Sequence, residues 1–227
     1  MHKKYVICLY IFYIAFVDSF VFADAINTEQ GNDPAKRAIY IVQEPRGATM
    51  DLVLFKPKKL KLPYAIKYPS QWYAAEIIVG APTVLLSREP IRKQSDEYKM
   101  GIAIYYMTNY FRQVLPRDSE LGKMAKVVIS VEDWEQSKNR FLAGFQKQAD
   151  VNILSKTDIT LSDLPAFKVE YQVVNPYDKL QVVAYFIRAG NHLLNLIYEA
   201  PISEFEEYRE IFEAAISSFK FNNAEAN

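Results

Sequence analysis

Three neighbouring segments near the end of the chain decide the fold: AFKVEYQVV at residues 166–174, LQVVAYFIR at 180–188 and HLLNLIYEA at 192–200. The first alternates apolar and polar residues, which is typical of a strand with one buried face. The other two are apolar on both faces, so the sheet must be covered on each side. Gly190 and Asn191 stand between the second and third segments, a signal for a tight hairpin. We therefore predict an antiparallel three-strand meander.

Two segments with helical periodicity flank this meander. The first begins at Ser130, where SVED forms a capping box, and should end near Asp150. The second begins at Ser203 with the capping box SEFE. Each segment carries one apolar stripe at helical spacing, which predicts a helix packed on a sheet. The stripes consist of Trp134, Phe141, Leu142 and Phe145 in the first segment and Phe205, Tyr208, Phe212, Ala215, Ile216 and Phe219 in the second.

Further strands are expected before the first helix. They are AIYIVQ at 38–43, TMDLVLF at 49–55, YAIKY at 64–68, PTVLLSREP at 82–90 and MGIAIYYMTNY at 100–110. The predicted fold class is α+β, an antiparallel β-sheet covered by helices on both faces. Because no linker or repeat interrupts the pattern, we predict one domain over residues 38–222, with a disordered tail at 223–227.

The first residues have the pattern of an export signal. Residues 1–23 combine a basic start, an apolar run at 5–17 and small residues before a cleavage site near Ala23. The apolar run is short for a transmembrane helix, which needs about 20 residues. Cleavage would give a periplasmic or extracellular protein with a flexible leader at 24–37, whereas an uncleaved N-terminal anchor is the alternative.

The stretch YAIKYPSQW, at residues 64–72, resembles the strand followed by YP-x-x-W near the start of the PsbP family. This family comprises the extrinsic photosystem II subunit and bacterial relatives, and envelope proteins of the DcrB type share the fold. The meander and the final amphipathic helix are also similar to that family, so the resemblance spans about residues 64–221. It implies an antiparallel sheet covered by helices, in a non-enzymatic envelope or lumenal protein. We interpret Pro69 and Trp72 as a corner of the sheet rather than a ligand clamp.

The sequence departs from the family at two places. Gln71 stands where a small residue usually precedes the tryptophan, and residues 49–63 have no obvious counterpart. A role in retaining calcium and chloride for water oxidation is therefore not carried over to this chain.

Chemistry-bearing motifs are scarce in the sequence. Cys8 is the only cysteine and lies in the apolar run, so the cleaved chain lacks thiols for disulfides, catalysis or metals. His192 is the single histidine after the signal, and no serine has a GxSxG context. We expect no enzyme activity, no cofactor and no metal site. Scattered carboxylates, for instance Asp158 and Asp163, are the remaining option for a calcium ion, but a solvated loop is the simpler interpretation of that pair.

Two groups of residues stand out as candidates for contact with a partner. Lys56, Lys58, Lys59 and Lys61 lie in one short loop, and each lysine near an anionic surface contributes about 1 kcal/mol. A solvated loop or a lysine-guarded edge strand is the alternative interpretation of that loop. The second group contains Tyr105, Tyr110, Phe111 and Arg112, and Tyr106 lies in the same stretch. Aromatic residues and arginine are the types that anchor protein interfaces.

Hydrophobic residues make up 50% of the chain. The net charge is zero, so no global electrostatic field selects nucleic acid as a partner. The leading functional hypothesis is a non-catalytic, exported accessory protein that docks on an envelope or membrane-bound protein complex. Weak contact with an anionic membrane surface is compatible with it. The alternatives are a carboxylate-based hydrolase of the envelope and a carrier of small apolar ligands.

Overall fold

The predicted meander is present in a computed structural model of the chain. Its strands are β8 (Leu164–Val174), β9 (Lys179–Ala189) and β10 (His192–Pro201), paired antiparallel in sequence order. The structure describes residues 38–43, 51–79, 81–89, 100–108, 110–111, 132–176 and 179–222. The expected signal peptide, leader and tail lie outside the described residues.

The meander belongs to an eight-stranded sheet with the order β1-β4-β5-β6-β10-β9-β8-β7. Every pairing between neighbouring strands in it is antiparallel. The other five strands are β1 (Ala38–Gln43), β4 (Tyr73–Val79), β5 (Ala81–Ser87), β6 (Gly101–Met107) and β7 (Val151–Leu161). This order confirms the α+β class and the antiparallel sheet.

A second, three-stranded sheet was not expected from the sequence. It has the order β11-β3-β2 and consists of β2 (Leu52–Phe55), β3 (Tyr64–Pro69) and β11 (Lys220–Phe221). In this sheet β3, from the first part of the domain, pairs with β11, the last strand. The YAIKYP strand thus lies in this small sheet beside the large one.

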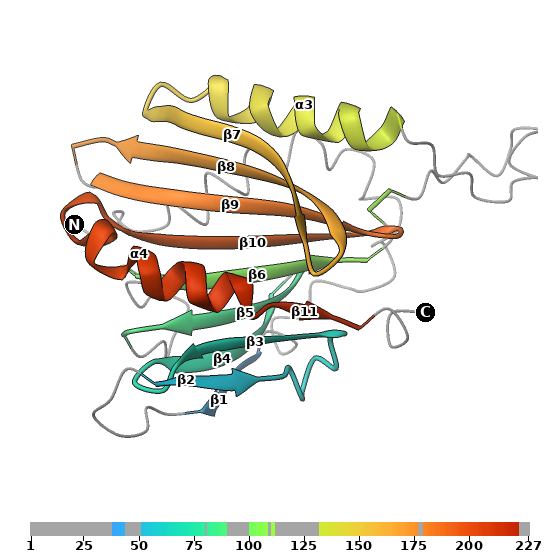
Figure 1. Cartoon of the computed structure of the whole chain (residues 1–227), viewed down its shortest axis with the longest axis vertical. Coiled ribbons are helices and arrows are strands. Elements are labelled where there is room, and N and C mark those ends of the chain that lie inside the picture. Colours follow the sequence, from blue (N-terminus) through green and yellow to red (C-terminus); the bar gives the residue numbers. More distant parts are fainter. Residues whose placement is uncertain are drawn as a thin grey trace, which may run out of the picture.

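Two helices complete the described part of the chain: α3 (Glu132–Gln146) and α4 (Ile202–Ser217). Figure 1 shows α3 alongside β7, and α4 across the middle strands of the large sheet. The expected N-cap of the first helix, Ser130, lies outside the described residues. That helix ends at Gln146, four residues before the expected stop.

The predicted capping box at Ser203 is wrong. The N-cap of α4 is Pro201, with φ −51° and ψ 139°, and no side chain caps the helix. Because proline fixes φ and has no N–H, it allows the helix to begin directly after β10, at Ile202. Ser203 is therefore inside the first turn, together with Glu204, whose charge suits that end of the helix dipole.

Two apolar clusters hold the described elements together. Residues of β9 alternate between them: Val183, Tyr185 and Ile187 belong to the first, while Val182, Ala184 and Phe186 belong to the second. Since successive side chains of a strand point to opposite faces, each cluster lies on its own face of β9. The first cluster includes α4 and the small sheet, and the second includes α3.

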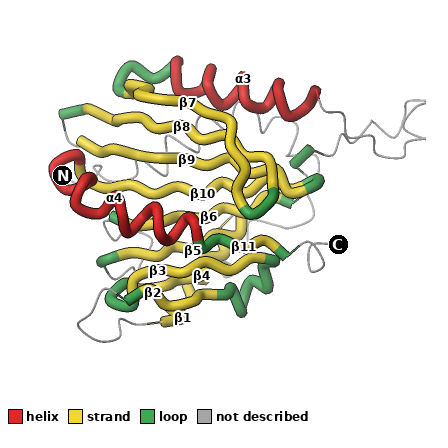
Figure 2. Tube along the Cα trace, in the orientation of Figure 1, coloured by secondary structure: helices red, strands yellow, loops and turns green. Residues whose placement is uncertain are grey.

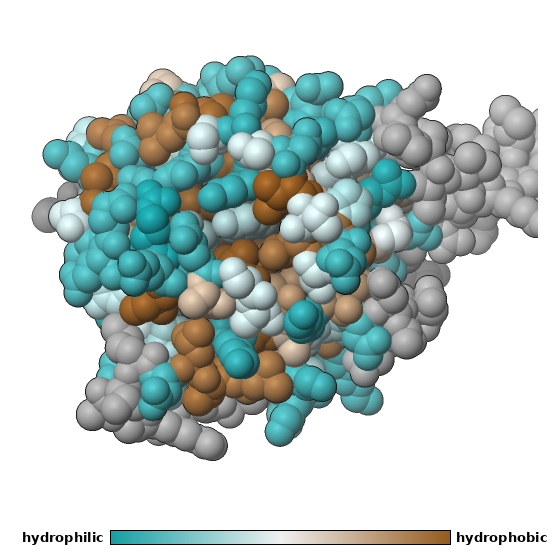
Figure 3. All heavy atoms as spheres, viewed as in Figure 1, coloured by the Kyte–Doolittle hydropathy of each residue, from teal (hydrophilic) through white to brown (hydrophobic). Residues whose placement is uncertain are grey.

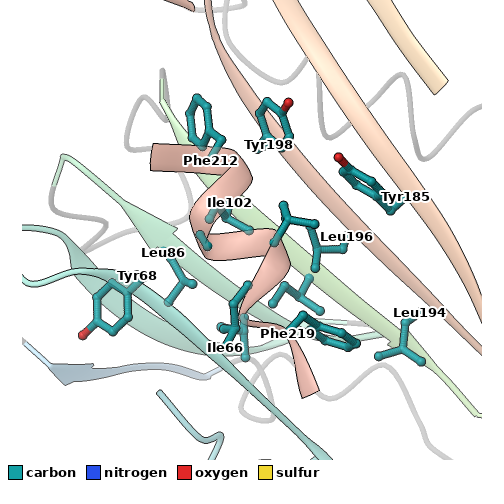
Figure 4. Close-up of a cluster of buried hydrophobic side chains, with 14 of the residues drawn as sticks. Ile66, Tyr68, Leu86, Ile102, Tyr185, Leu194, Leu196, Tyr198, Phe212 and Phe219 are labelled. Carbon is teal, nitrogen blue, oxygen red and sulfur yellow. The ribbon is translucent and has the colours of Figure 1, made fainter. Parts of the chain in front are cut away.

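The first cluster joins distant parts of the chain (Figure 4). Ile66 and Tyr68 of the small sheet contribute to the same cluster as Leu86 and Ile102 of the large sheet. The predicted stripe of the second helix is buried here, and Phe219 remains buried although it follows the end of α4. This face is therefore filled by side chains from β3, the large sheet and the last helix.

Two tight hairpin turns lie in this part of the sheet, one between β9 and β10 and the other between β7 and β8 (Figure 2). His192 pairs with Ala189, which leaves Gly190 and Asn191 as a two-residue turn. Gly190 has φ +60°, as the first central position of a type II′ turn requires, so the predicted hairpin is confirmed. The turn before β8 consists of Ser162 and Asp163, with φ 53° and 60°. Two positive φ values fit a type I′ turn, here without glycine.

Candidate functional site

The basic loop connects β2 to β3 on the small sheet. The side chains of Lys56, Lys58, Lys59 and Lys61 are all exposed to solvent. Pro57, Leu62 and Pro63 between and after them are buried. The loop is therefore anchored by its apolar residues, and its four charges lie outside.

A buried carboxylate from the large sheet holds the backbone of this loop. Glu76 of β4 has an exposed fraction of 0%, and its Oε1 accepts hydrogen bonds from the backbone N–H groups of Lys58, at 2.9 Å, and Lys59, at 3.2 Å. Its Oε2 accepts one from the N–H of Leu60, at 2.6 Å. One side chain thus fixes three consecutive residues that precede it by sixteen to eighteen positions.

The energetics of a buried carboxylate explain this arrangement. An unpaired charge inside a protein is costly, so a buried Glu needs several donors. Consecutive backbone N–H groups form a concave site for an anion, and hydrogen bonds to a charged acceptor are among the stronger ones. Burial raises the pKa of the nearby Tyr64 well above its usual value, and the charge of Glu76 raises it further. The tyrosine therefore stays protonated beside the carboxylate.

Lys61 ends the loop in an uncommon backbone conformation. Its φ is 50°, in the left-handed region that glycine adopts most easily. A long side chain there costs about 1–2 kcal/mol relative to ordinary backbone conformations. This backbone conformation disfavours lysine. A requirement other than local backbone preference therefore selects the residue at position 61.

The aromatic interface candidates separate into two environments. Tyr105 and Tyr110 are half-buried, whereas Phe111 is buried with an exposed fraction of 4%. The ring of Phe111 lies edge-on to Trp134 of α3, with centroids 5.9 Å apart, and belongs to the second cluster. The structure therefore assigns Phe111 to the core and not to an interface. Arg112 lies outside the described residues, and the guanidinium over the Phe111 ring belongs to Arg188, at 5.1 Å.

The corner at Trp72 is confirmed. The N–H of Trp72 donates to the carbonyl of Pro69 over 2.9 Å, which closes the turn between β3 and β4. The indole has an exposed fraction of 1% and lies edge-on to Phe212 of α4, with centroids 5.8 Å apart. The tryptophan is a packing residue at the junction of the two sheets and the last helix.

His192 is the first residue of β10, directly after the hairpin. Its ring is half-buried and stacks on Tyr106 of β6, with centroids 5.3 Å apart. A stacked position at a turn agrees with the interpretation of His192 as a turn residue.

A polar network between α4 and the meander was not predicted. Arg209 of α4 donates through Nη2 to Glu170 Oε1 over 3.1 Å and pairs with Glu206 over 2.7 Å. Gln181 donates to the same Glu170 oxygen over 2.7 Å and accepts from Gln172 over 3.2 Å. The hydrogen bond between Arg209 and Glu206 raises the pKa of the Arg209 guanidinium, and the hydrogen bond with Glu170 raises that pKa further. The network fixes α4 on β8 and β9.

Two tyrosines of the first cluster, Tyr185 and Tyr198, lie close to this network. Burial raises the pKa of Tyr185 to about 12, with smaller contributions from the charges of Glu213 and Glu170. Burial also raises the pKa of Tyr198. The rings are 6.3 Å apart, and Tyr198 stacks on Phe212 at 4.4 Å. Both phenols are therefore neutral core groups at ordinary pH.

The two aspartates considered for calcium are placed separately. Asp158 lies in β7 and accepts from the Lys138 ammonium over 2.8 Å, while Asp163 occupies the turn before β8. Asp158 is thus in a strand and not in the loop expected for it. Within the described part of the chain, no group of three or more His, Cys, Asp or Glu side chains is placed to hold a metal ion. None of the described helices has the length and apolar character to cross a membrane.

No protein-family model and no curated protein sequence matches the chain. Several solved structures are similar in shape. Cyanobacterial PsbP (CyanoP) from Synechocystis sp. PCC 6803 is 13% identical with a TM-score of 0.46, covering 79% of this chain and 98% of that chain. PA94 from Pseudomonas aeruginosa, a protein of unknown function, is 13% identical with a TM-score of 0.43, covering 74% and 94%.

A third similar structure is LpqN of Mycobacterium tuberculosis, a protein involved in cell envelope biogenesis. It is 10% identical with a TM-score of 0.39, covering 84% of this chain and 87% of that chain. The neighbours thus include a protein of the family that the sequence resembles. At these identities and scores, no activity or partner is transferred from them to this chain.

Proposed function

We propose that this chain is an exported, non-catalytic accessory protein that docks on an envelope or membrane-associated protein complex. The observation that carries the proposal is the basic loop, in which four exposed lysines stand on a backbone held by the buried Glu76. A loop whose backbone is already fixed loses less conformational entropy on binding than a free one. It is therefore suited to present a set of charges to a partner.

The charge pattern of the loop favours docking on a partner of opposite charge. Exposed charges act over about one Debye length, roughly 8 Å at physiological ionic strength. They steer a partner of opposite charge and mainly affect the association rate, which falls as salt rises. A positively charged loop on a chain of zero net charge thus selects an acidic surface as its partner.

The hydrolase alternative has less support among the described carboxylates. The oxygens of Glu76 are bound by three backbone N–H groups, and those of Glu170 by Arg209 and Gln181. His192 stacks on Tyr106. General acid-base catalysis needs a group within hydrogen-bond reach of a substrate proton. In these positions the acids serve the fold, which supports a non-catalytic role.

The decisive experiment is a crosslinked capture from envelope extract. The exported chain should recover a membrane-associated complex, and the recovery should fall for the variant K56Q/K58Q/K59Q/K61Q. The control K147Q/K156Q/K179Q removes three exposed lysines elsewhere and should capture as wild type does. Turnover of a cell-wall or peptide substrate, with no partner recovered, would replace the accessory role by an enzymatic one. Recovery of a bound apolar ligand instead would favour a carrier.

The proposed export of the chain is tested separately. We propose cleavage near Ala23, which gives a periplasmic or extracellular protein. N-terminal sequencing of the exported form should then start at Asp24. A chain that starts at Met1 and sediments with membranes would instead be anchored by its N-terminal segment.

A further inference from the structure

The small sheet has one face turned away from the core, and this face continues into the basic loop. Leu54 of β2 is the direct partner of Lys67 of β3, and Lys220 of β11 is the partner of Ala65. Partners across antiparallel strands share a face, as do residues two apart in one strand. Leu54, Lys67 and Lys220 therefore stand on one face, whereas Ile66 and Tyr68 belong to the first cluster.

The side chains of this face are open to solvent. Lys67 and Lys220 are exposed, and Leu54 has an exposed fraction of 56%, the largest among the exposed large hydrophobic residues of the described chain. Figure 3 shows hydrophobic side chains at the surface over β2, with hydrophilic residues beside them. Together with Lys56, Lys58, Lys59 and Lys61, these three residues make up what we call the lysine face.

Its charge is almost entirely of one sign. Asp51 is the one acidic residue in the segments 51–69 and 220–222, which contain all six lysines. Glu76 lies buried beneath the loop, and Asp163 stands at the border, in the turn whose Ser162 accepts a hydrogen bond from the N–H of Phe221. Six lysines thus outnumber the acids around them, and the face complements an anionic surface.

A membrane-associated complex presents both protein and lipid, and the residue types of this face fit the lipid better. Protein interfaces are enriched in Trp, Tyr and Arg and depleted in Lys. These segments contain no Arg or Trp, and both of their tyrosines, Tyr64 and Tyr68, are buried. Lysine ammonium groups are compact charges on flexible stems, which suit mobile headgroups better than fixed hydrogen-bond geometry.

The exposed leucine has a role in the same contact. A lysine stem can lie along apolar surface while its ammonium group reaches the water, so an apolar residue between lysines can enter the headgroup region without burying a charge. We propose that the lysine face binds the headgroups of anionic phospholipids, with Leu54 inserted between them. This rests on the proposed docking function, because it names the lipid around the complex as the contact of this face.

The test is cosedimentation of the exported chain with vesicles of phosphatidylcholine alone, or mixed with phosphatidylglycerol. Wild type should bind the anionic vesicles and release them as salt rises. The variant K67Q/K220Q should bind roughly fivefold less tightly for each lysine removed. Leu54→Ser should also weaken binding, while the controls K147Q/K156Q and Leu154→Ser should not. Leu154 is an exposed leucine of β7, with an exposed fraction of 46%, so it matches Leu54 in chemistry and exposure.

The outcomes separate this inference from the accessory function. Equal binding to neutral and anionic vesicles, or unchanged binding of K67Q/K220Q and Leu54→Ser, overturns the lipid assignment. If a protein complex is captured but the vesicles are not bound, the lysine face contacts protein and the lipid assignment falls alone. Vesicle binding with the expected variant pattern, without a captured complex, supports the lipid contact and removes the accessory role. Unchanged thermal melting of each variant shows that a loss of binding is not a loss of folding.

Discussion

The backbone N–H of Leu60 donates to a carboxylate oxygen of Glu76 over 2.6 Å, which joins a surface loop of the small sheet to a buried strand of the large one. Together with the two neighbouring hydrogen bonds, this contact gives the lysines of the loop a fixed support. It also places a buried charge between the two sheets, so the loop and the packing of the sheets depend on the same residue.

Replacing Glu76 by Gln should loosen the loop. The amide keeps the shape of the side chain but presents N–H donors where an oxygen now accepts, so at least one backbone N–H loses its partner. We expect a loss of about 1.5–3 kcal/mol in the free energy of unfolding, measured by urea denaturation. Amide hydrogen exchange at Lys58, Lys59 and Leu60 should accelerate. Glu204→Gln, which breaks a surface ion pair with Arg88, should cost less than about 1 kcal/mol. Equal effects of the two substitutions would contradict the anchoring role.

Truncating Phe219 should destabilise the domain strongly. Its exposed fraction is 1%, and its ring lies 5.8 Å from that of Tyr64, so it joins the end of α4 to the small sheet. Phe219→Ala should lower the free energy of unfolding by about 3–5 kcal/mol, because a cavity remains where the ring was. The exposed Leu154 is the control, for which Leu154→Ala should change stability by less than about 0.5 kcal/mol. A small effect at Phe219 would mean that the two sheets do not share one core.

The turn between β9 and β10 should tolerate asparagine better than alanine at position 190. Gly190 has φ +60°, and a Cβ added there meets nothing within 4 Å, so only the backbone conformation opposes a side chain. Gly190→Ala should cost about 1–2 kcal/mol, measured by thermal or urea unfolding. Gly190→Asn should cost less, since asparagine adopts positive φ more readily. If alanine were as stable as glycine, the turn would have to adopt another conformation.

Stability should fall in alkaline solution between about pH 10 and about pH 12. The pKa of Tyr185 is about 12 in the folded chain and about 10 in an unfolded one, so the unfolded state loses its proton first. The contribution is complete below pH 10 and is lost as the pH rises to the folded value, at about 1.4 kcal/mol per pH unit.

Urea unfolding across this range should show a shallower alkaline loss for Tyr185→Phe than for wild type. The pKa values of Tyr64 and Tyr198 are also raised by burial, so some alkaline loss remains in the variant. Parallel curves for the two proteins would show that Tyr185 titrates normally in the folded state.

Lys61→Gly should separate the stability of the loop from its contact function. Glycine adopts φ 50° without steric cost, although it loses more entropy on folding, so the variant should be up to about 1 kcal/mol more stable than wild type. The same substitution removes one charge from the loop and should weaken binding to an anionic surface. Lys61→Gln is the control that removes the charge and keeps the strain. A variant that is less stable and binds unchanged would contradict both expectations.

The local pattern of the sequence determined the meander, its hairpin and the apolar faces of both helices. Alternation along 166–174, apolar runs at 180–188 and 192–200, and Gly190 between them specify pairing between neighbours in the chain, so short-range rules suffice. The buried stripe from Phe205 to Phe212 follows from helical spacing alone. The corner at Trp72 was predictable because a proline-led turn and a large ring leave few other placements.

Other features were decided by contacts between distant segments. The strands β4 and β7 escaped prediction, since β4 carries Glu76 within an apolar run and the turn after β7 has Ser162 and Asp163 instead of glycine. The small sheet needs β3 to meet β11 across most of the chain. The capping box at Ser203 was overruled because β10 ends in Pro201 and the helix begins at once.

The burial of Glu76 is the clearest case of what only the tertiary structure decided. A glutamate in a sequence indicates an exposed residue, because an unpaired carboxylate is costly to bury. Three backbone N–H groups from a loop sixteen to eighteen residues earlier supply the missing partners, and they do so only when the two sheets have come together. The sequence by itself determined which residues of the loop carry charge, whereas the fold decided that these charges stand on a fixed support.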